Sequence, residues 1–216
     1  MATYSKTASY GSRVTQAISG SSNGRATYFN VGKSSGGLEG RYFVYFDLSE
    51  INSNAIISSA TLTINQYDDS NDWSASVNVD VRRAASSWNA NSITWNNQPS
   101  VFSAQDSAIT ISGIATRSIS FDVTNAVKSA VSLSNYGFRI AAVSSSNSTA
   151  KYFRSDTYSS SSLQPKLTVS YTPILERVAI SGSYRDVVLT QVLINGTWRS
   201  VSSKKVLIDG VWRGIY

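Results

Sequence analysis

Arg41-Tyr-Phe-Val-Tyr-Phe-Asp-Leu48 places an apolar residue at every second position. Successive side chains of a β-strand point to opposite faces, so Tyr42, Val44, Phe46 and Leu48 are expected on one face. The same period of two returns in five later segments, which are 60–65, 77–82, 118–123, 138–142 and 167–171. Many short strands with one buried face each predict an all-β fold, an antiparallel jelly-roll-like β-sandwich.

One segment has a helical period instead. Between Thr124 and Leu133, the residues Val127, Ala130 and Val131 fall on one face, which predicts a helix of one or two turns. No stretch approaches 18 consecutive apolar residues, so neither a transmembrane helix nor a membrane partner is expected.

The composition changes at Pro173, and from there the chain repeats with a period of 14 residues. The three copies are 178–187, 192–201 and 206–215. Each copy places Ser-Gly, Asn-Gly or Asp-Gly between two apolar stretches, and Asn-Gly and Asp-Gly accept the positive φ angles of a tight hairpin turn. The sequence therefore predicts a β-sandwich over residues 1–172 and a small β-hairpin meander over residues 173–216.

Each repeat carries an aromatic residue followed by arginine at the equivalent position. These pairs are Tyr184 and Arg185, Trp198 and Arg199, and Trp212 and Arg213. The rings could form a core within the chain or a surface for assembly. Lone hairpins are marginal in water, and Trp and Arg dominate interface hot spots, so we expect residues 173–216 to serve in attachment or oligomerisation.

The composition excludes several kinds of chemistry. The chain has no His and no Cys, so imidazole bases, Ser-His-Asp triads, thiolate nucleophiles and disulfides are impossible. Its 13 carboxylates include no pair marked as that of a glycosidase, and no tyrosine is marked as the base of a lyase. We therefore predict that the protein is not an enzyme. The net charge of +6 is mild and no basic run exceeds two residues, so no nucleic-acid partner is expected.

Six motifs of the first 172 residues carry a resemblance to a known family. The most specific is Trp88 followed by Thr94-Trp-Asn-Asn-Gln-Pro99. Residues 41–49, 57–64, 121–124, 135–138 and 165–171 supply the others. In this order the motifs resemble the DNRLRE domain family, whose members are β-sandwich modules of extracellular and surface proteins. Some of its members are alginate-binding modules attached to polysaccharide lyases, so the resemblance implies a module like those that bind carbohydrates.

The repeats resemble short C-terminal segments of phage structural and tail-associated proteins. The N-terminus also has no apolar segment of signal-peptide length. Together these features imply a bacteriophage virion structural protein, made in the host cytoplasm and displayed on the particle surface, either as capsid decoration or on the tail for receptor binding. Its partners would be other virion proteins and copies of itself. The alternative is a secreted, extracellular carbohydrate-binding module of a polysaccharide-degrading system.

A candidate glycan site follows from the strand faces opposite the apolar ones. These faces carry Arg41, Tyr45, Tyr67, Arg82 and Arg139. Arginine would bond the carboxylate or phosphate groups of an acidic polysaccharide, and the tyrosines would offer flat surfaces to sugar rings. The alternatives are an ordinary solvated face and a protein interface.

One acidic cluster could hold a metal ion, although no other cofactor is expected. Asp68, Asp69, Asn71 and Asp72 offer oxygen ligands to Ca²⁺, but the segment lacks the central Gly and the distal Glu of an EF-hand loop. A solvated hairpin loop is the favoured interpretation.

Several other conspicuous residues are expected to be structural. Trp88, Trp95 and Pro99 lie in a loop rich in Asn and Ser, where anchoring of an irregular backbone is favoured over contact with a ligand. Asp47 and Asp122 lie near strand ends, where a carboxylate can accept hydrogen bonds from free backbone N–H groups.

Overall fold

The structure is a computed structural model of the 216-residue chain. It describes residues 1–22, 25–67, 75–143 and 146–173, and beyond these the backbone of six strands between residues 176 and 214. The chain divides into two compact units, Met1–Thr172 and Pro173–Tyr216.

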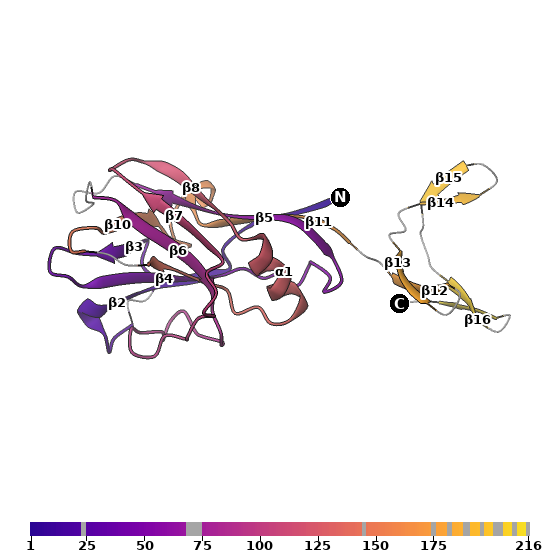
Figure 1. The fold of residues 1–216 in the computed structure, drawn as a ribbon, viewed down its shortest axis with the longest axis horizontal. Coiled ribbons are helices and arrows are strands. Elements are labelled where there is room, and N and C mark those ends of the chain that lie inside the picture. The colour runs from indigo at the N-terminus through magenta and orange to yellow at the C-terminus, as the bar shows by residue number, and fades with distance from the viewer. Residues whose placement is uncertain are drawn as a thin grey trace. The chain divides into compact units, whose positions relative to one another are not determined.

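The first unit is built almost entirely from antiparallel strands (Figure 1). Their bounds are β1 Ala2–Thr7, β2 Tyr10–Thr15, β3 Tyr28–Lys33, β4 Glu39–Tyr45, β5 Ile56–Gln66, β6 Val77–Arg83, β7 Ser107–Ile111, β8 Arg117–Asp122, β9 Phe138–Ala142, β10 Lys151–Arg154 and β11 Lys166–Thr172. Two 3₁₀ turns, Gln16–Ile18 and Ser161–Leu163, lie in the connections. The prediction of an all-β sandwich is confirmed.

Two layers form the sandwich. In one layer β5 pairs with β8, β10 and β11, while β1 extends the layer beyond β11 and β3 extends it beyond β10. In the other, β4 lies between β2 and β9, and β6 and β7 follow beyond β9. A short ladder between β3 and β4 joins the two layers.

The core lies between these layers. The predicted apolar face of residues 42–48 is buried there with Phe29, Leu62, Phe121 and Val169. The Phe29 and Tyr42 rings stack with their centroids 3.8 Å apart. The predicted helix is also present as α1, Thr124–Ser132, which buries Ala126, Val127 and Ala130 and lies beside β5 (Figure 1).

The opposite face of β4 differs from the simple expectation of a polar outer face. Phe43 points outward there, yet its exposed fraction is 0%. Residues of the loop between β6 and β7 cover it, and a second small core forms from Val14, Phe43 and Ile93, with Trp88 and Trp95 packed against it. The strand pattern shows which side chains alternate, but it does not show that a distant loop will fold back over one face.

The second unit contains the three hairpins that the repeats predict. β12 Glu176–Ile180 pairs with β13 Ser183–Val187, β14 Gln191–Ile194 with β15 Thr197–Ser200, and β16 Lys205–Ile208 with β17 Val211–Gly214. Two residues separate the strands of each pair, as a tight hairpin requires. Among the described tail strands no ladder joins one hairpin to the next, so each hairpin is a separate two-stranded sheet and these strands do not form the predicted continuous meander.

No helix in the described part of the chain has the length and apolar character needed to cross a membrane.

Candidate glycan-binding cleft

The sheet register brings four of the five predicted glycan residues onto one surface. Arg41 and Tyr45 flank Phe43 on the outer face of β4, Phe43 pairs with Arg139 on β9, and Arg139 pairs with Arg82 on β6. Tyr67 follows β5 in the other layer, where its ring contacts Tyr28 and Tyr152, so the structure does not bring it together with the other four.

Asp80, a carboxylate on the same surface, forms ion pairs with both Arg82 and Arg139. Arg82 Nε lies 2.5 Å from Asp80 Oδ2, and Arg139 Nη2 lies 3.0 Å from Asp80 Oδ1. The side chain of Asp80 is 1% exposed and that of Arg139 is 14% exposed. Burial lowers the pKa of Arg139, and the charge of Asp80 opposes that shift. The three residues form a buried ion-pair network that supports the sheet.

Arg41 has a different structural role. Its guanidinium carbon lies 4.2 Å from the centroid of the Trp95 ring, and its nitrogens donate to Glu39 Oε1 (2.7 Å) and Gln98 Oε1 (3.1 Å). Arg41 therefore helps to hold the covering loop, which contributes both Trp95 and Gln98, against β4.

Trp88 fixes the same loop at its other end. Its Nε1 donates a hydrogen bond of 2.8 Å to the backbone oxygen of Tyr136, and its ring contacts Tyr10 and Phe43 at centroid distances of 5.1 and 5.7 Å. The prediction that Trp88 and Trp95 anchor an irregular loop is confirmed. Trp88 is only half-buried, so part of its indole remains on the surface.

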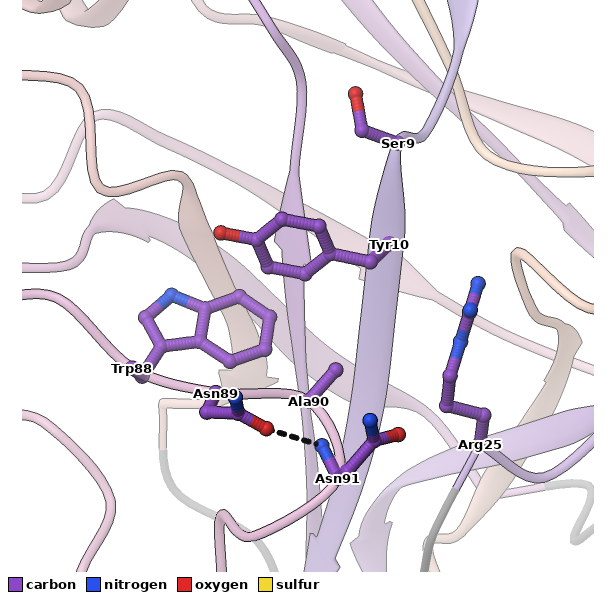
Figure 2. A pocket seen from close by; sticks show the side chains of 7 residues that line it. All are labelled: Ser9, Tyr10, Arg25, Trp88, Asn89, Ala90 and Asn91. Carbon is purple, nitrogen blue, oxygen red and sulfur yellow. Dashed lines mark hydrogen bonds between the residues drawn. The ribbon is translucent and has the colours of Figure 1, made fainter.

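A cleft opens where this loop meets β2. It has a volume of about 350 Å³ and is lined by Ser9, Tyr10, Arg25, Trp88, Asn89, Ala90 and Asn91. Figure 2 shows the Tyr10 and Trp88 rings on one side, Arg25 on the other, and Asn91 between them. The cleft thus combines aromatic surface, two side-chain amides, a hydroxyl and a guanidinium.

The aromatic wall of the cleft is packed from both sides. The Tyr10 ring stacks on Tyr45, with 4.7 Å between centroids and 12° between planes, and meets Trp88 edge-on. Burial raises the pKa of Tyr10 and of Tyr45, and the negative charge that the Tyr45 phenolate would carry raises that of Tyr10 further. Tyr45, a predicted glycan residue, thus supports the cleft from behind.

A buried network holds the guanidinium wall. Arg25 Nη2 lies 2.5 Å from Asp156 Oδ2, while the Tyr42 hydroxyl donates to Asp156 Oδ1 (2.8 Å) and accepts from the Asp156 N–H (3.1 Å). Burial, followed by the charge of Asp156, raises the pKa of Tyr42 well above its usual value. Glycine is required at position 11 of β2, because a Cβ there would collide with the Tyr42 hydroxyl.

The amide wall comes from a turn of the loop. Asn89 Oδ1 accepts a hydrogen bond of 2.8 Å from the Asn91 N–H, which fixes the backbone between them (Figure 2). The side chain of Asn91 is exposed at the cleft. Asn89 and Asn91 belong to the polar stretch that follows Trp88 in the sequence. The fold, which the sequence pattern does not show, brings this stretch close to Tyr10 and Arg25.

A larger cleft of about 680 Å³ shares Ser9 with the first. Its lining is rich in hydroxyl groups and includes Lys6 and Lys166. Lys6 forms an exposed ion pair with Glu50. The two clefts therefore adjoin at the turn between β1 and β2, with different chemical character.

The predicted roles of Asp47 and Asp122 are confirmed. Asp47 Oδ1 accepts from the N–H of Ser49 (3.0 Å), and Asp122 Oδ1 accepts from the N–H (2.9 Å) and the hydroxyl (2.6 Å) of Thr124. These hydrogen bonds lower the pKa of both carboxyl groups. The two carboxylates hold local backbone turns.

Two predicted sites cannot be placed. The proposed Ca²⁺ ligands Asp68, Asp69, Asn71 and Asp72 lie outside the described residues. The structure describes the strands that carry Tyr184, Arg185, Trp198, Arg199, Trp212 and Arg213, but not their side chains. Within the described ranges, no three His, Cys, Asp or Glu side chains gather in a way that could hold a metal ion.

Comparison with known families adds a finding that agrees with this site. The model of carbohydrate-binding module family 96 matches residues 3–171, nearly the whole of the first unit. The chain belongs to this family. The family is described as a carbohydrate-binding module, which agrees with the implied carbohydrate-binding β-sandwich and is consistent with the prediction of a non-enzyme. No curated protein matches the chain.

Proposed function

We propose that the family 96 domain binds a polysaccharide in the cleft between β2 and the covering loop, and that it does so without cleaving it. The observation that carries this proposal is the juxtaposition of Tyr10, Trp88 and Asn91 around one cavity. Aromatic faces stack on the apolar faces of sugar rings, and a few placed amides and hydroxyls give orientation, which is the usual composition of a ligand site.

The test is isothermal titration with a panel of soluble polysaccharides, using the full chain. Trp88→Ala should abolish measurable binding, because it removes one aromatic wall of the cleft. Asn91→Ala should weaken binding about 2- to 10-fold, the range expected for one lost hydrogen bond. Tyr67→Ala is the matched control, since it removes an aromatic side chain from the other layer and should leave the affinity unchanged.

Two results would contradict the proposal. Unchanged binding by a folded Trp88→Ala protein would place the site elsewhere on the molecule. Sustained release of reducing ends or unsaturated sugars by a preparation free of contaminating enzyme would overturn the non-catalytic role.

We further propose that residues 173–216 attach the binding domain to a larger assembly or to copies of itself. Lone hairpins are marginal in water, and the three described hairpins each form a separate two-stranded sheet. The segment also carries six basic and three acidic residues, so half of the net charge of +6 lies on its 44 residues. Deletion of residues 173–216 should leave a cooperative melt but abolish self-association in light scattering.

The setting that we propose for this assembly is the surface of a phage particle, as capsid decoration or on the tail. The support is the resemblance of the three repeats to phage structural segments. A secreted module of a polysaccharide-degrading system is the competing proposal. Mass spectrometry of purified particles from the source distinguishes the two, because a virion protein should be present in stoichiometric amounts.

A further inference from the structure

Ser9 is the junction of the two adjoining clefts, because it lines both of them. Its N–H donates a hydrogen bond of 2.9 Å to the Tyr45 oxygen, and its Oγ accepts one of 3.1 Å from the Asp47 N–H. The preceding Ala8 N–H donates to the Pro165 oxygen at 2.9 Å. Backbone groups of both layers therefore hold this junction, and the hydroxyl hydrogen of the exposed Ser9 remains available to a ligand.

The second cleft offers polar groups but no aromatic wall. Lys6 is paired with Glu50 there, whereas Lys166 is exposed and forms no ion pair with any residue that the structure describes. Hydroxyl and ammonium groups both donate hydrogen bonds to the oxygens of a sugar. The hydroxyl groups of the lining belong to Ser5, Thr7, Ser9, Ser161 and Ser162.

The strand register places part of this lining on the outer face of β1 and β11. Tyr4 is buried in the core, so Thr7, an odd number of positions further along β1, faces outward. Lys166 pairs directly with Thr7 and therefore shares that face. The chain then continues from β1 through Ser9 into Tyr10, which begins β2 and lines the aromatic cleft. The lining of one cleft is thus continuous with the lining of the other.

The two clefts complement each other chemically. The aromatic cleft has stacking surfaces and side-chain amides, and the second cleft has hydroxyl groups and the exposed Lys166. Resting on the proposed function, we infer that one chain of an acidic polysaccharide occupies both clefts and crosses Ser9. One sugar ring stacks on Tyr10 and Trp88, and Lys166 donates charge-assisted hydrogen bonds to the carboxylate of a sugar further along the chain. The second cleft is a further subsite, and Lys166 is its specificity-determining residue.

Two connected subsites predict a particular dependence on chain length. An oligosaccharide that fills the aromatic cleft alone gains nothing from Lys166. One that also reaches the second cleft binds there as an intramolecular step, so its affinity rises without any change in the first cleft. A longer chain also offers more registers to a single cleft, so the rise alone does not decide the question. The decisive quantity is the effect of Lys166 on long and on short chains.

The experiment titrates the full chain with size series of mannuronate, guluronate and galacturonate oligosaccharides, from the disaccharide to the dodecasaccharide. At about 0.01 M NaCl, at least one series should gain about tenfold or more in affinity with length. Lys166→Ala should lower the affinity for the long members about tenfold and leave that for the shortest binding member unchanged. Lys128→Ala is the matched control, because it removes the same charge from the exposed side of α1 and should change neither affinity.

Amide chemical shifts of the ¹⁵N-labelled wild-type protein locate the ligand without any substitution. Short members of the series should shift the amides of Trp88 and Asn91. Long members should shift these and, in addition, the amides of Ser162 and Lys166. If a variant does not fold, this difference between short and long members decides.

Three other outcomes oppose the inference in distinguishable ways. Long-chain binding that Trp88→Ala abolishes and Lys166→Ala leaves unchanged would overturn the second subsite and leave the proposed cleft intact. Binding that Lys166→Ala weakens equally for short and long chains, and that Trp88→Ala leaves unchanged, would overturn the proposed location as well. Binding of none of the three acidic series would overturn the inference, while Trp88-dependent binding of a neutral polysaccharide would still support the proposed function.

Discussion

The outer faces of the two layers come from the same alternating pattern but have different structures. On β5 and β8 the outward side chains are small and hydroxylated, and Thr63 and Ser120 hydrogen-bond across the strands at 3.2 Å. On β4 and β9 the outward side chains are large, with Phe43 and Arg139 side by side in register. One face stays open to solvent, while a loop covers part of the other.

The difference shows how this sandwich gains a binding site. The one aromatic residue of β5 and β8 is Phe121, which is buried in the core, so the outer face of these two strands offers no ring to a sugar. A loop that folds over large outward side chains creates a second core, and the edge of that cover leaves a cleft beside Tyr10 and Trp88. The site therefore lies at the boundary between covered and uncovered sheet, where aromatic rings are held in place but are not fully buried.

The largest loss of stability is expected on the covered face, when its central carboxylate is removed. Asp80→Ala should destabilise the protein by about 3–5 kcal/mol, because it leaves Arg139 with an unpaired buried charge. Urea denaturation followed by tryptophan fluorescence measures this. Glu50→Ala is the control, since it breaks the exposed pair with Lys6 and should cost less than about 1 kcal/mol. Equal costs in the two variants would show that the network around Asp80 does not support the sheet.

Removing the anchor of the covering loop should cause the next largest loss of stability. Trp88→Ala deletes contacts with Tyr10 and Phe43 and leaves the Tyr136 oxygen without its donor, so we expect a loss of about 2–4 kcal/mol. Trp88→Phe keeps an aromatic ring and should cost less. Near-ultraviolet circular dichroism should show loss of the aromatic environment in the alanine variant. An unchanged spectrum and melt would mean that the loop does not depend on this anchor.

The sequence predicted one of these faces better than the other, for physical reasons. Period-two alternation identified the buried side chains of Tyr42, Val44, Phe46 and Leu48, and a helical period identified α1, because both patterns depend on neighbours in the chain. The cleft depends on contacts between distant segments, such as Tyr10 with Trp88 and Arg25 with Asp156. The arginines chosen from the pattern were placed correctly on an outer face, but their buried carboxylate partners could not be seen without the register of the strands.

Alkaline titration separates the buried tyrosines from ordinary ones. Burial, together with the nearby Asp47 and Glu50 charges, raises the pKa of Tyr4 to about 12. Its unfolded value is about 10, so the neutral form stabilises the folded state below pH 10. That contribution should fall as the pH rises from about 10 through about 12. Tyr4→Phe should flatten the stability profile in this range, measured by urea denaturation at each pH. An equally steep fall in the variant would assign the alkaline loss to other groups, such as Tyr42.

The smallest effect is expected on the open face. Thr63→Ala and Ser120→Ala each remove one side of an exposed hydroxyl pair, for which water readily substitutes. A double-mutant cycle should give a coupling of about 0.2–1 kcal/mol, the usual range for cross-strand pairs. Neither variant should change glycan affinity, because neither residue lines either cleft. A larger coupling would show that the hydroxyl face is more than a solvated surface. A loss of affinity in a folded Thr63→Ala protein would move the binding site to the open face, where Thr63 pairs with Ser120 and Lys166.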